Sequence, residues 1–84
     1  MATVDALLSH LADVLRELRK SRDRSQEAIA HDAQLTVNAY GRIERGQADP
    51  GLTSLARIAD ALGVSLAELG AALDERRKAA ARAR

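Results

Sequence analysis

Residues 25–46 read SQEAIAHDAQLTVNAYGRIERG, and this stretch sets the architecture expected of the whole chain. Ser25 can cap one helix, because its side-chain oxygen can accept a hydrogen bond from an amide of the first turn. Thr36 can cap a second helix in the same way, and Gly46 marks the end of that helix. The stretch therefore predicts two short helices separated by about three residues.

Small and apolar residues indicate how these two helices pack. Ala30 is small enough to let the helices cross closely, and Leu35 is expected to fill the turn between them. Tyr40 and Ile43 are expected to anchor the second helix to the core. This pattern is a helix-turn-helix, in which the exposed N-terminus of the second helix can enter the major groove of DNA.

Helical spacing continues on both sides of this stretch. Leucines at three- and four-residue steps predict a first helix over about residues 4–22. A fourth helix begins near Leu52 and stops at Gly63, and Ser65 can cap a fifth. No alternating strand pattern appears in the sequence. The predicted fold is therefore all-α, a compact orthogonal bundle of five helices.

Charge is distributed unevenly along the chain. The sequence has 13 Lys and Arg against 12 Asp and Glu, a net charge of +1. Residues 16–45 hold seven basic and five acidic side chains, whereas residues 76–84 hold five basic side chains and no acidic one. Such asymmetry can orient a protein on a polyanion even when the net charge is small.

The sequence divides into a domain over residues 1–75 and a C-terminal tail over residues 76–84. The tail has no apolar stripe to bury, so we expect it to be basic and flexible and to fray. Two interpretations of the tail stay open, namely non-specific attraction to phosphates and a solvated chain end.

Composition excludes several function classes. A chain of 84 residues is enough for one small domain, and the absence of Cys excludes disulfides and cysteine-ligated zinc. His10 and His31 are too few for a metal site, so neither a metal nor another cofactor is expected. No apolar run is long enough to cross a membrane, and residues 1–15 do not have the pattern of a signal peptide. A cytoplasmic protein is therefore expected.

Motifs across most of the chain resemble one family of DNA-binding proteins. In order they are Leu15-Arg16-Glu17-Leu18-Arg19, Ser25-Gln26-Glu27, Arg42-Ile43-Glu44-Arg45-Gly46, Pro50, Leu55, Ile58-Ala59, Ala61-Leu62-Gly63-Val64-Ser65 and Glu68-Leu69. Together they are similar to the phage-repressor and Cro type of helix-turn-helix domain, also called XRE-like, over about residues 8–70. The small size also resembles the controller proteins of restriction–modification systems.

The resemblance implies which side chains contact double-stranded DNA. They are Gln26, Thr36, Val37, Asn38, Ala39, Arg42 and Arg45. Asn38 would read a base edge with its paired donor and acceptor, and Arg42 would reach a guanine or a phosphate. Arg45, at the helix end, would hold a phosphate. The resemblance also implies that Arg19 and Glu44 pair and fix the angle of the DNA-reading helix; the alternative is two separate surface charges.

The chain departs from the family pattern at several positions. Gln34 stands where the turn often has Gly, and Asp23-Arg24 replaces a Gly and an apolar residue. Gly41 lies inside the second helix of the motif, where glycine costs about 0.5–1 kcal/mol. Since the first turn of that helix has no Arg or Lys, we expect DNA shape to contribute more to recognition.

A homodimer is expected, because one DNA-reading helix rarely gives enough affinity. Two-fold dimers place two such helices roughly 34 Å apart, about one turn of DNA. Leu66, Leu69 and Leu73 share one face of the fifth helix. They either close the monomer core or meet a second copy, and we expect Leu66 and Leu69 to face inward and Leu73 to be shared.

The main hypothesis is a sequence-specific transcriptional regulator that binds a palindromic operator as a homodimer, in the manner of a repressor. The alternative is an antitoxin-like or adaptor module that mainly binds another protein. An enzyme is not expected, because no nucleophile–base set, phosphate loop or metal cluster is visible. No small-molecule ligand is evident either.

Overall fold

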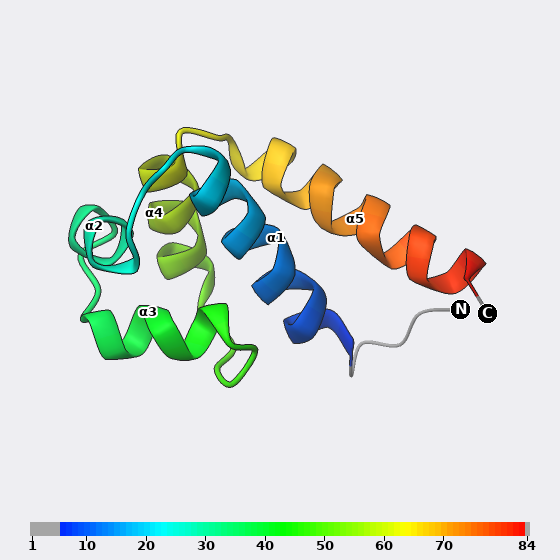
Figure 1. The fold of residues 1–84 in the computed structure, drawn as a ribbon, viewed down its shortest axis with the longest axis horizontal. Coiled ribbons are helices and arrows are strands. Elements are labelled where there is room, and N and C mark those ends of the chain that lie inside the picture. The colour runs from blue at the N-terminus through cyan, green and yellow to red at the C-terminus, as the bar shows by residue number, and fades with distance from the viewer. Residues whose placement is uncertain (1–5, 84) are drawn as a thin grey trace.

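The computed structural model describes residues 6–83, and these form five helices without a strand (Figure 1). The helices are α1 (Leu7–Ser21), α2 (Gln26–Asp32), α3 (Val37–Glu44), α4 (Leu52–Leu62) and α5 (Leu66–Arg82). The predicted all-α bundle of five helices is confirmed. The expected start of the first helix at residue 4 lies outside the described residues.

The predicted caps are present at the N-termini of α2 and α3. Ser25 Oγ accepts a hydrogen bond from the Ala28 amide at 3.0 Å, and Thr36 Oγ1 accepts one from the Ala39 amide at 3.0 Å. These bonds satisfy amides of the first helical turn that have no partner within the helix. Gly63 ends α4 with a φ of 75°, a left-handed conformation that glycine adopts without a steric penalty.

α5 begins with a reciprocal cap. Ser65 Oγ accepts a hydrogen bond from the Glu68 amide, and the Glu68 carboxylate accepts one from the Ser65 amide, both at 3.0 Å. Its backbone hydrogen bond with Ser65 lowers the pKa of Glu68. The beginning of α5 is thus fixed by four residues that are adjacent in sequence.

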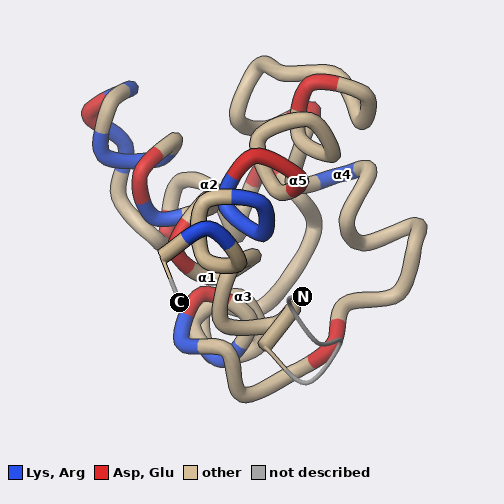
Figure 2. Tube along the Cα trace, turned by 90° about the vertical axis from the view of Figure 1, so that its right-hand side faces the viewer, with Lys and Arg blue, Asp and Glu red and all other residues tan. Residues whose placement is uncertain are grey.

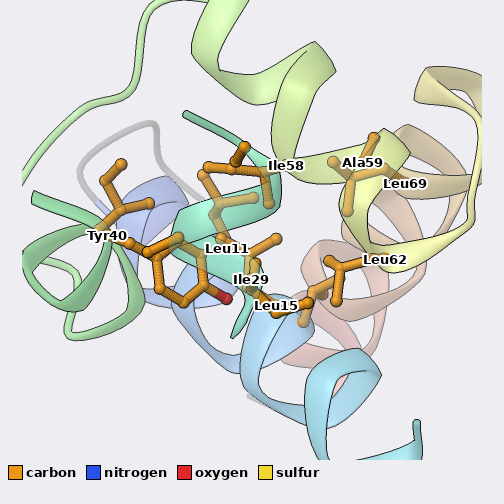
Figure 3. Close-up of a cluster of buried hydrophobic side chains, with 12 residues drawn as sticks. Leu11, Leu15, Ile29, Tyr40, Ile58, Ala59, Leu62 and Leu69 are labelled. Atoms are coloured by element: carbon orange, nitrogen blue, oxygen red, sulfur yellow. The ribbon is translucent and has the colours of Figure 1, made fainter. Parts of the chain in front are cut away.

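The core lies where α1, α2, α3 and α4 meet, and α5 closes one side of it (Figure 3). Its largest fully buried apolar side chains are Tyr40, Leu15, Ile29, Ile58, Leu62 and Leu69. The prediction that Tyr40 anchors the core is confirmed. The Tyr40 hydroxyl is buried as well.

The helices are arranged so that α3 lies at an edge of the bundle. It packs on α1 and α2, and in Figure 1 no other helix lies beyond it on its lower side. α5 lies beside α1 and extends past the rest of the bundle.

The end of the chain differs from the expectation. A fraying tail was expected from residue 76, but α5 continues without a break to Arg82. Local apolar spacing predicts no contact for this stretch, whereas Arg76 forms ion pairs with Asp13 and Glu17 of α1.

Candidate nucleic-acid interface

The N-terminal half of α3 presents short side chains to solvent. Thr36, Val37 and Asn38 are exposed, and Val37 shows 45% of its surface although it is apolar. Ala39 is half-buried, and Arg42 is exposed one turn further along. Five of the predicted DNA contacts therefore lie on or next to one accessible surface, which we call the outer face of α3 (residues 36–39 and 42).

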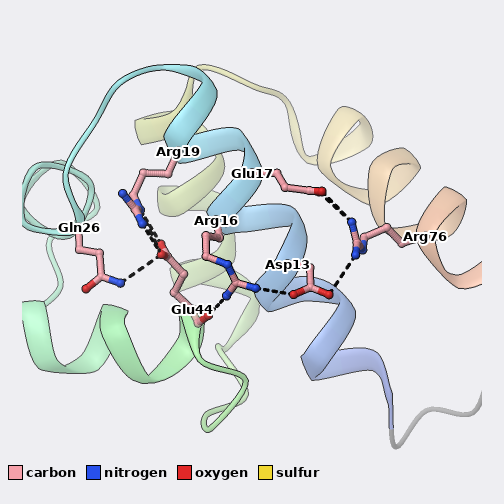
Figure 4. Close-up of polar contacts among 7 residues, drawn as sticks. All are labelled: Asp13, Arg16, Glu17, Arg19, Gln26, Glu44 and Arg76. Atoms are coloured by element: carbon pink, nitrogen blue, oxygen red, sulfur yellow. Dashed lines mark hydrogen bonds and ion pairs between the residues drawn. The ribbon is translucent and has the colours of Figure 1, made fainter. Parts of the chain in front are cut away.

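The opposite side of α3 is held by a buried ion pair (Figure 4). Arg19 of α1 donates to both carboxylate oxygens of Glu44, from Nε to Oε2 at 2.8 Å and from Nη2 to Oε1 at 2.7 Å. The Glu44 side chain is 1% exposed and that of Arg19 13%. The structure thus brings together the two residues that the resemblance pairs, with the bidentate geometry that arginine and carboxylate favour.

Each side chain of this pair has a pKa shifted in the direction that favours its charged form. Burial by itself would raise the pKa of Glu44, but hydrogen bonds from Arg19 and other neighbours outweigh burial and leave that pKa lowered. The hydrogen bond to Glu44 raises the pKa of Arg19. Both groups are therefore charged in the folded state.

Gln26 makes a contact that the sequence did not predict. Its Nε2 donates to Glu44 Oε1 at 3.1 Å, so this half-buried side chain ties the start of α2 to the same carboxylate. The resemblance assigned Gln26 to DNA alone. No local pattern connects residues 26 and 44, because the contact depends on how α2 and α3 cross.

The turns on either side of α2 use left-handed backbone at non-glycine residues. Asp23 has a φ of 53° and Gln34 a φ of 59°. At both positions the family that this chain resembles often has glycine. A left-handed conformation costs a residue with a Cβ roughly 1 kcal/mol. Leu35 follows in the turn and its amide donates to the Ala30 carbonyl at 2.8 Å, which closes the motif.

The C-terminal end of α3 carries a second arginine. Arg45 is exposed, its Nε donates to Gln47 Oε1 at 3.3 Å, and its guanidinium lies over Gly41. A Cβ added at Gly41 would lie 2.9 Å from Arg45 Nη1, so glycine leaves room for this arginine. Neither Arg42 nor Arg45 forms an ion pair with a residue between 6 and 83.

Most other basic positions lie close to acidic ones. Figure 2 shows Lys and Arg mixed with Asp and Glu along the trace. Arg24, for example, pairs with Asp32 and also donates to the Ala61 carbonyl at 3.2 Å. Arginines at the end of α3 without an ion-pair partner in the described chain are therefore available to an external anion.

The three leucines predicted for dimerisation lie in different environments. Leu69 is 2% exposed and belongs to the core of the monomer, so it offers no surface to a second copy. Leu73 is partly buried against that core. Leu66, expected to face inward, lies in the first turn of α5 and is 43% exposed.

Two features are absent from the described helices α1–α5 and the side chains on them: a membrane span and a metal site. None of its helices has the length and apolar character needed to cross a membrane. Residues 6–83 also contain no group of three or more His, Asp or Glu side chains placed to hold a metal ion.

Comparison with known proteins relates the sequence to DNA-binding regulators. Residues 15–69 match the model of the Helix-turn-helix family. Control protein C.MunI of Mycoplasma sp is 39% identical over 56 residues, which cover 66% of this chain and 76% of that protein. The transcriptional repressor RstR of the cryptic phage CTXphi, from Vibrio cholerae, is 36% identical over 55 residues, 66% of this chain and 50% of RstR.

Comparison of structures gives the same relationship. The restriction-modification controller protein C.AhdI from Aeromonas hydrophila has a TM-score of 0.71 and 35% identity, over 74% of this chain and 94% of that one. The chain spans only about half the length, 46% to 50%, of three of the curated relatives it matches. The family match covers more than half of the chain and includes α2, the turn and α3. The chain therefore belongs to the helix-turn-helix family, in its phage-repressor or XRE-like form.

Proposed function

We propose that this protein is a DNA-binding transcriptional regulator that acts as a homodimer on a palindromic operator. The observation that carries the proposal is the outer face of α3, which is exposed while the inner side of the same helix is held by Tyr40, Ile43 and Glu44. Relatives named as a transcriptional repressor and as a control protein support it. Such a protein binds rather than catalyses, and it works in the cytoplasm where the DNA is.

The predicted DNA contacts have distinct roles in this proposal. Asn38 can form paired hydrogen bonds with an adenine, and Val37 can contact a thymine methyl. Arg42 reaches a guanine edge or a phosphate, and Arg45 holds a phosphate beyond the helix end. Gln26 donates to Glu44 through Nε2. In the proposal, its Oε1 and its backbone amide at the start of α2 are the groups that contact DNA.

The dimer in this proposal uses the exposed part of α5. Leu66 is an apolar side chain of which 43% is exposed, and Leu73 is only partly buried. A two-fold axis through this region would present two copies of α3 to one side of the duplex, about one DNA turn apart.

Selection of bound sequences from random DNA, together with the mass of the protein in solution, tests the proposal. We expect palindromic sites and a dimer mass. Binding to the selected site should weaken steeply with salt, because each neutralised phosphate adds about 0.9 to the slope of log K against log salt. No enriched sequence, or an affinity independent of salt, would contradict the proposal.

Two substitutions test the assignment of the outer face. Asn38→Ala and Arg42→Ala should each weaken operator binding by about tenfold, within the roughly 1–3 kcal/mol of a good base contact, and leave binding to random DNA nearly unchanged. Both side chains are exposed, so the thermal midpoint should not change. An equal loss on both kinds of DNA would instead assign the residue to a phosphate.

A further inference from the structure

Arg76, the first residue of the basic stretch at the end of the chain, forms ion pairs within the molecule. Arg76 Nη1 donates to both carboxylate oxygens of Glu17 at 2.8 Å, and its Nη2 donates to Asp13 Oδ2 at 3.0 Å (Figure 4). All three side chains are at least one-third exposed, and both acids lie on α1. One arginine of α5 thus bridges two acids that are four residues apart on the adjacent helix.

The contacts continue from Asp13 to α3. The other carboxylate oxygen of Asp13 accepts a hydrogen bond from Arg16, and Arg16 Nη1 donates to the backbone carbonyl of Glu44 at 3.2 Å. Glu44 is the last residue of α3, where carbonyls have no partner within the helix. A continuous set of polar contacts therefore runs from α5 through Asp13 and Arg16 to the end of α3.

Two further basic residues of this stretch also have acidic neighbours. Arg77 lies 4.0 Å from Asp74, and Lys78 lies 3.8 Å from Glu75. The sequence leaves two interpretations of this stretch open, phosphate attraction and a solvated end, and the pairing of Arg76 with α1 adds a third. Two acids of α1 offset its charge in the folded chain.

We propose that Asp13 and Arg76 are positioning residues for DNA binding, which hold Arg16 in place so that it fixes the C-terminal end of α3. This inference rests on the proposed function, because its effect is measured on operator affinity. Neither residue contacts DNA in the proposal. α5 thereby affects the orientation of α3 through α1, in addition to covering the core with Leu69.

Asp13→Asn is the decisive variant, because two explanations predict opposite signs. Removing an acid from a DNA-binding protein should strengthen binding if only long-range electrostatics matters. The proposal predicts weaker operator binding, by about three- to tenfold, because Arg16 loses the carboxylate that orients it. Glu75→Gln removes the same charge outside the set of contacts, and it should leave affinity unchanged or slightly raised.

Arg76→Gln separates positioning from phosphate contact. A positioning residue lowers operator affinity, here by about two- to fivefold, without changing the slope of log K against log salt. A phosphate contact would reduce that slope by about 0.9. Lys78→Gln is the matched control, because it removes one basic charge two residues away and should change neither quantity.

Amide hydrogen exchange without DNA gives a readout independent of the proposed function. The amides of Gly46 and Gln47 close the end of α3 by donating to the carbonyls of Ile43 and Arg42. They should exchange faster in Asp13→Asn than in the unsubstituted protein or in Glu75→Gln.

Each outcome of these experiments decides one proposal. If the unsubstituted protein binds no operator, the proposed function fails, while hydrogen exchange still reports whether Asp13 stabilises the end of α3. If Asp13→Asn binds the operator as tightly as the unsubstituted protein or more tightly, the positioning role is overturned. Unchanged exchange at Gly46 and Gln47 would overturn it as well.

Discussion

The two faces of α3 belong to the same eight-residue helix, but their surroundings are opposite. The inner face contributes Tyr40, Ile43 and Glu44, which are at most 5% exposed. The outer face carries side chains such as Asn38 and Arg42 that touch solvent. The difference shows how one short helix can be both fixed and accessible: the residues that hold it are not those that meet a partner.

The inner face should show the largest effect on stability. Glu44→Ala removes the partner of Arg19 and leaves a mostly buried guanidinium without its carboxylate, which costs about 3–5 kcal/mol. Glu17→Ala is the matched control, because Glu17 also pairs with an arginine but is 61% exposed, and it should cost less than about 1 kcal/mol.

Urea denaturation of both variants measures this contrast. A large decrease in the midpoint is expected for Glu44→Ala only, and a variant that does not fold at all agrees with the same prediction. Similar decreases for the two variants would mean that burial of the ion pair does not distinguish the faces.

Acid should reduce the stabilisation that the inner face provides through Glu44, whereas the outer face has no acidic side chain to titrate. The folded-state pKa of Glu44 lies below its usual value of 4.5, so its contribution is fully present above pH 4.5 and is lost as the pH falls through the folded pKa. Hydrogen bonds also lower the pKa values of Glu68 and Asp32, so their contributions to the stability of the fold are likewise lost as the pH falls.

Thermal midpoints recorded between about pH 6 and pH 3 test this dependence. Glu44→Gln should be less stable at neutral pH and should lose less stability on acidification than the unsubstituted protein. Parallel curves for the two proteins would show that Glu44 does not contribute to the acid response.

Arg45, an exposed residue next to the outer face, should affect binding without affecting folding. Arg45→Gln should reduce the salt slope of operator binding by about 0.9, because one phosphate contact is lost. Stability should change by less than about 0.5 kcal/mol, as for most exposed positions. Arg57→Gln removes an equal charge from the exposed surface of α4 and should leave the slope unchanged. A slope that changes equally in both would indicate a general charge effect.

The smallest effect is expected at Gly41, where the two faces meet. Gly41→Ala should stabilise the fold by up to about 1 kcal/mol, because alanine favours the helix interior. The added methyl group displaces the Arg45 guanidinium, so operator affinity should fall by about two- to threefold, or roughly 0.5 kcal/mol. In the Arg45→Gln background the same substitution should cause no further loss; additive losses would exclude a coupling between these positions.

Local chemistry explains why so much of the fold could be predicted. Ser25, Thr36 and Ser65 each cap a helix through a side chain and an amide three residues later, so the sequence contains both partners of the bond. Leucine spacing likewise predicts which residues share a helix face. It does not predict how much of that face a neighbour covers, and for this reason it predicts an inward-facing Leu66 although that side chain is exposed.

The candidate site was predictable where it depends on one helix and not where helices meet. The exposed positions of α3 follow from its anchors Tyr40 and Ile43 and from helical periodicity. The bond from Gln26 to Glu44 and the bridge from Arg76 to α1 join residues 18 and at least 59 positions apart. No periodicity relates such distant residues, so neither contact has a signal in a single sequence.

The amino-acid sequence by itself determined the helices, their caps, the motif and the side of α3 that stays in solvent, because these depend on neighbours within a few residues. Only the tertiary structure decided which charges are used inside the molecule and which remain for a partner. The physical reason is that an ion pair depends on the distance between two side chains in space. That distance was set when α1 packed between α3 and α5.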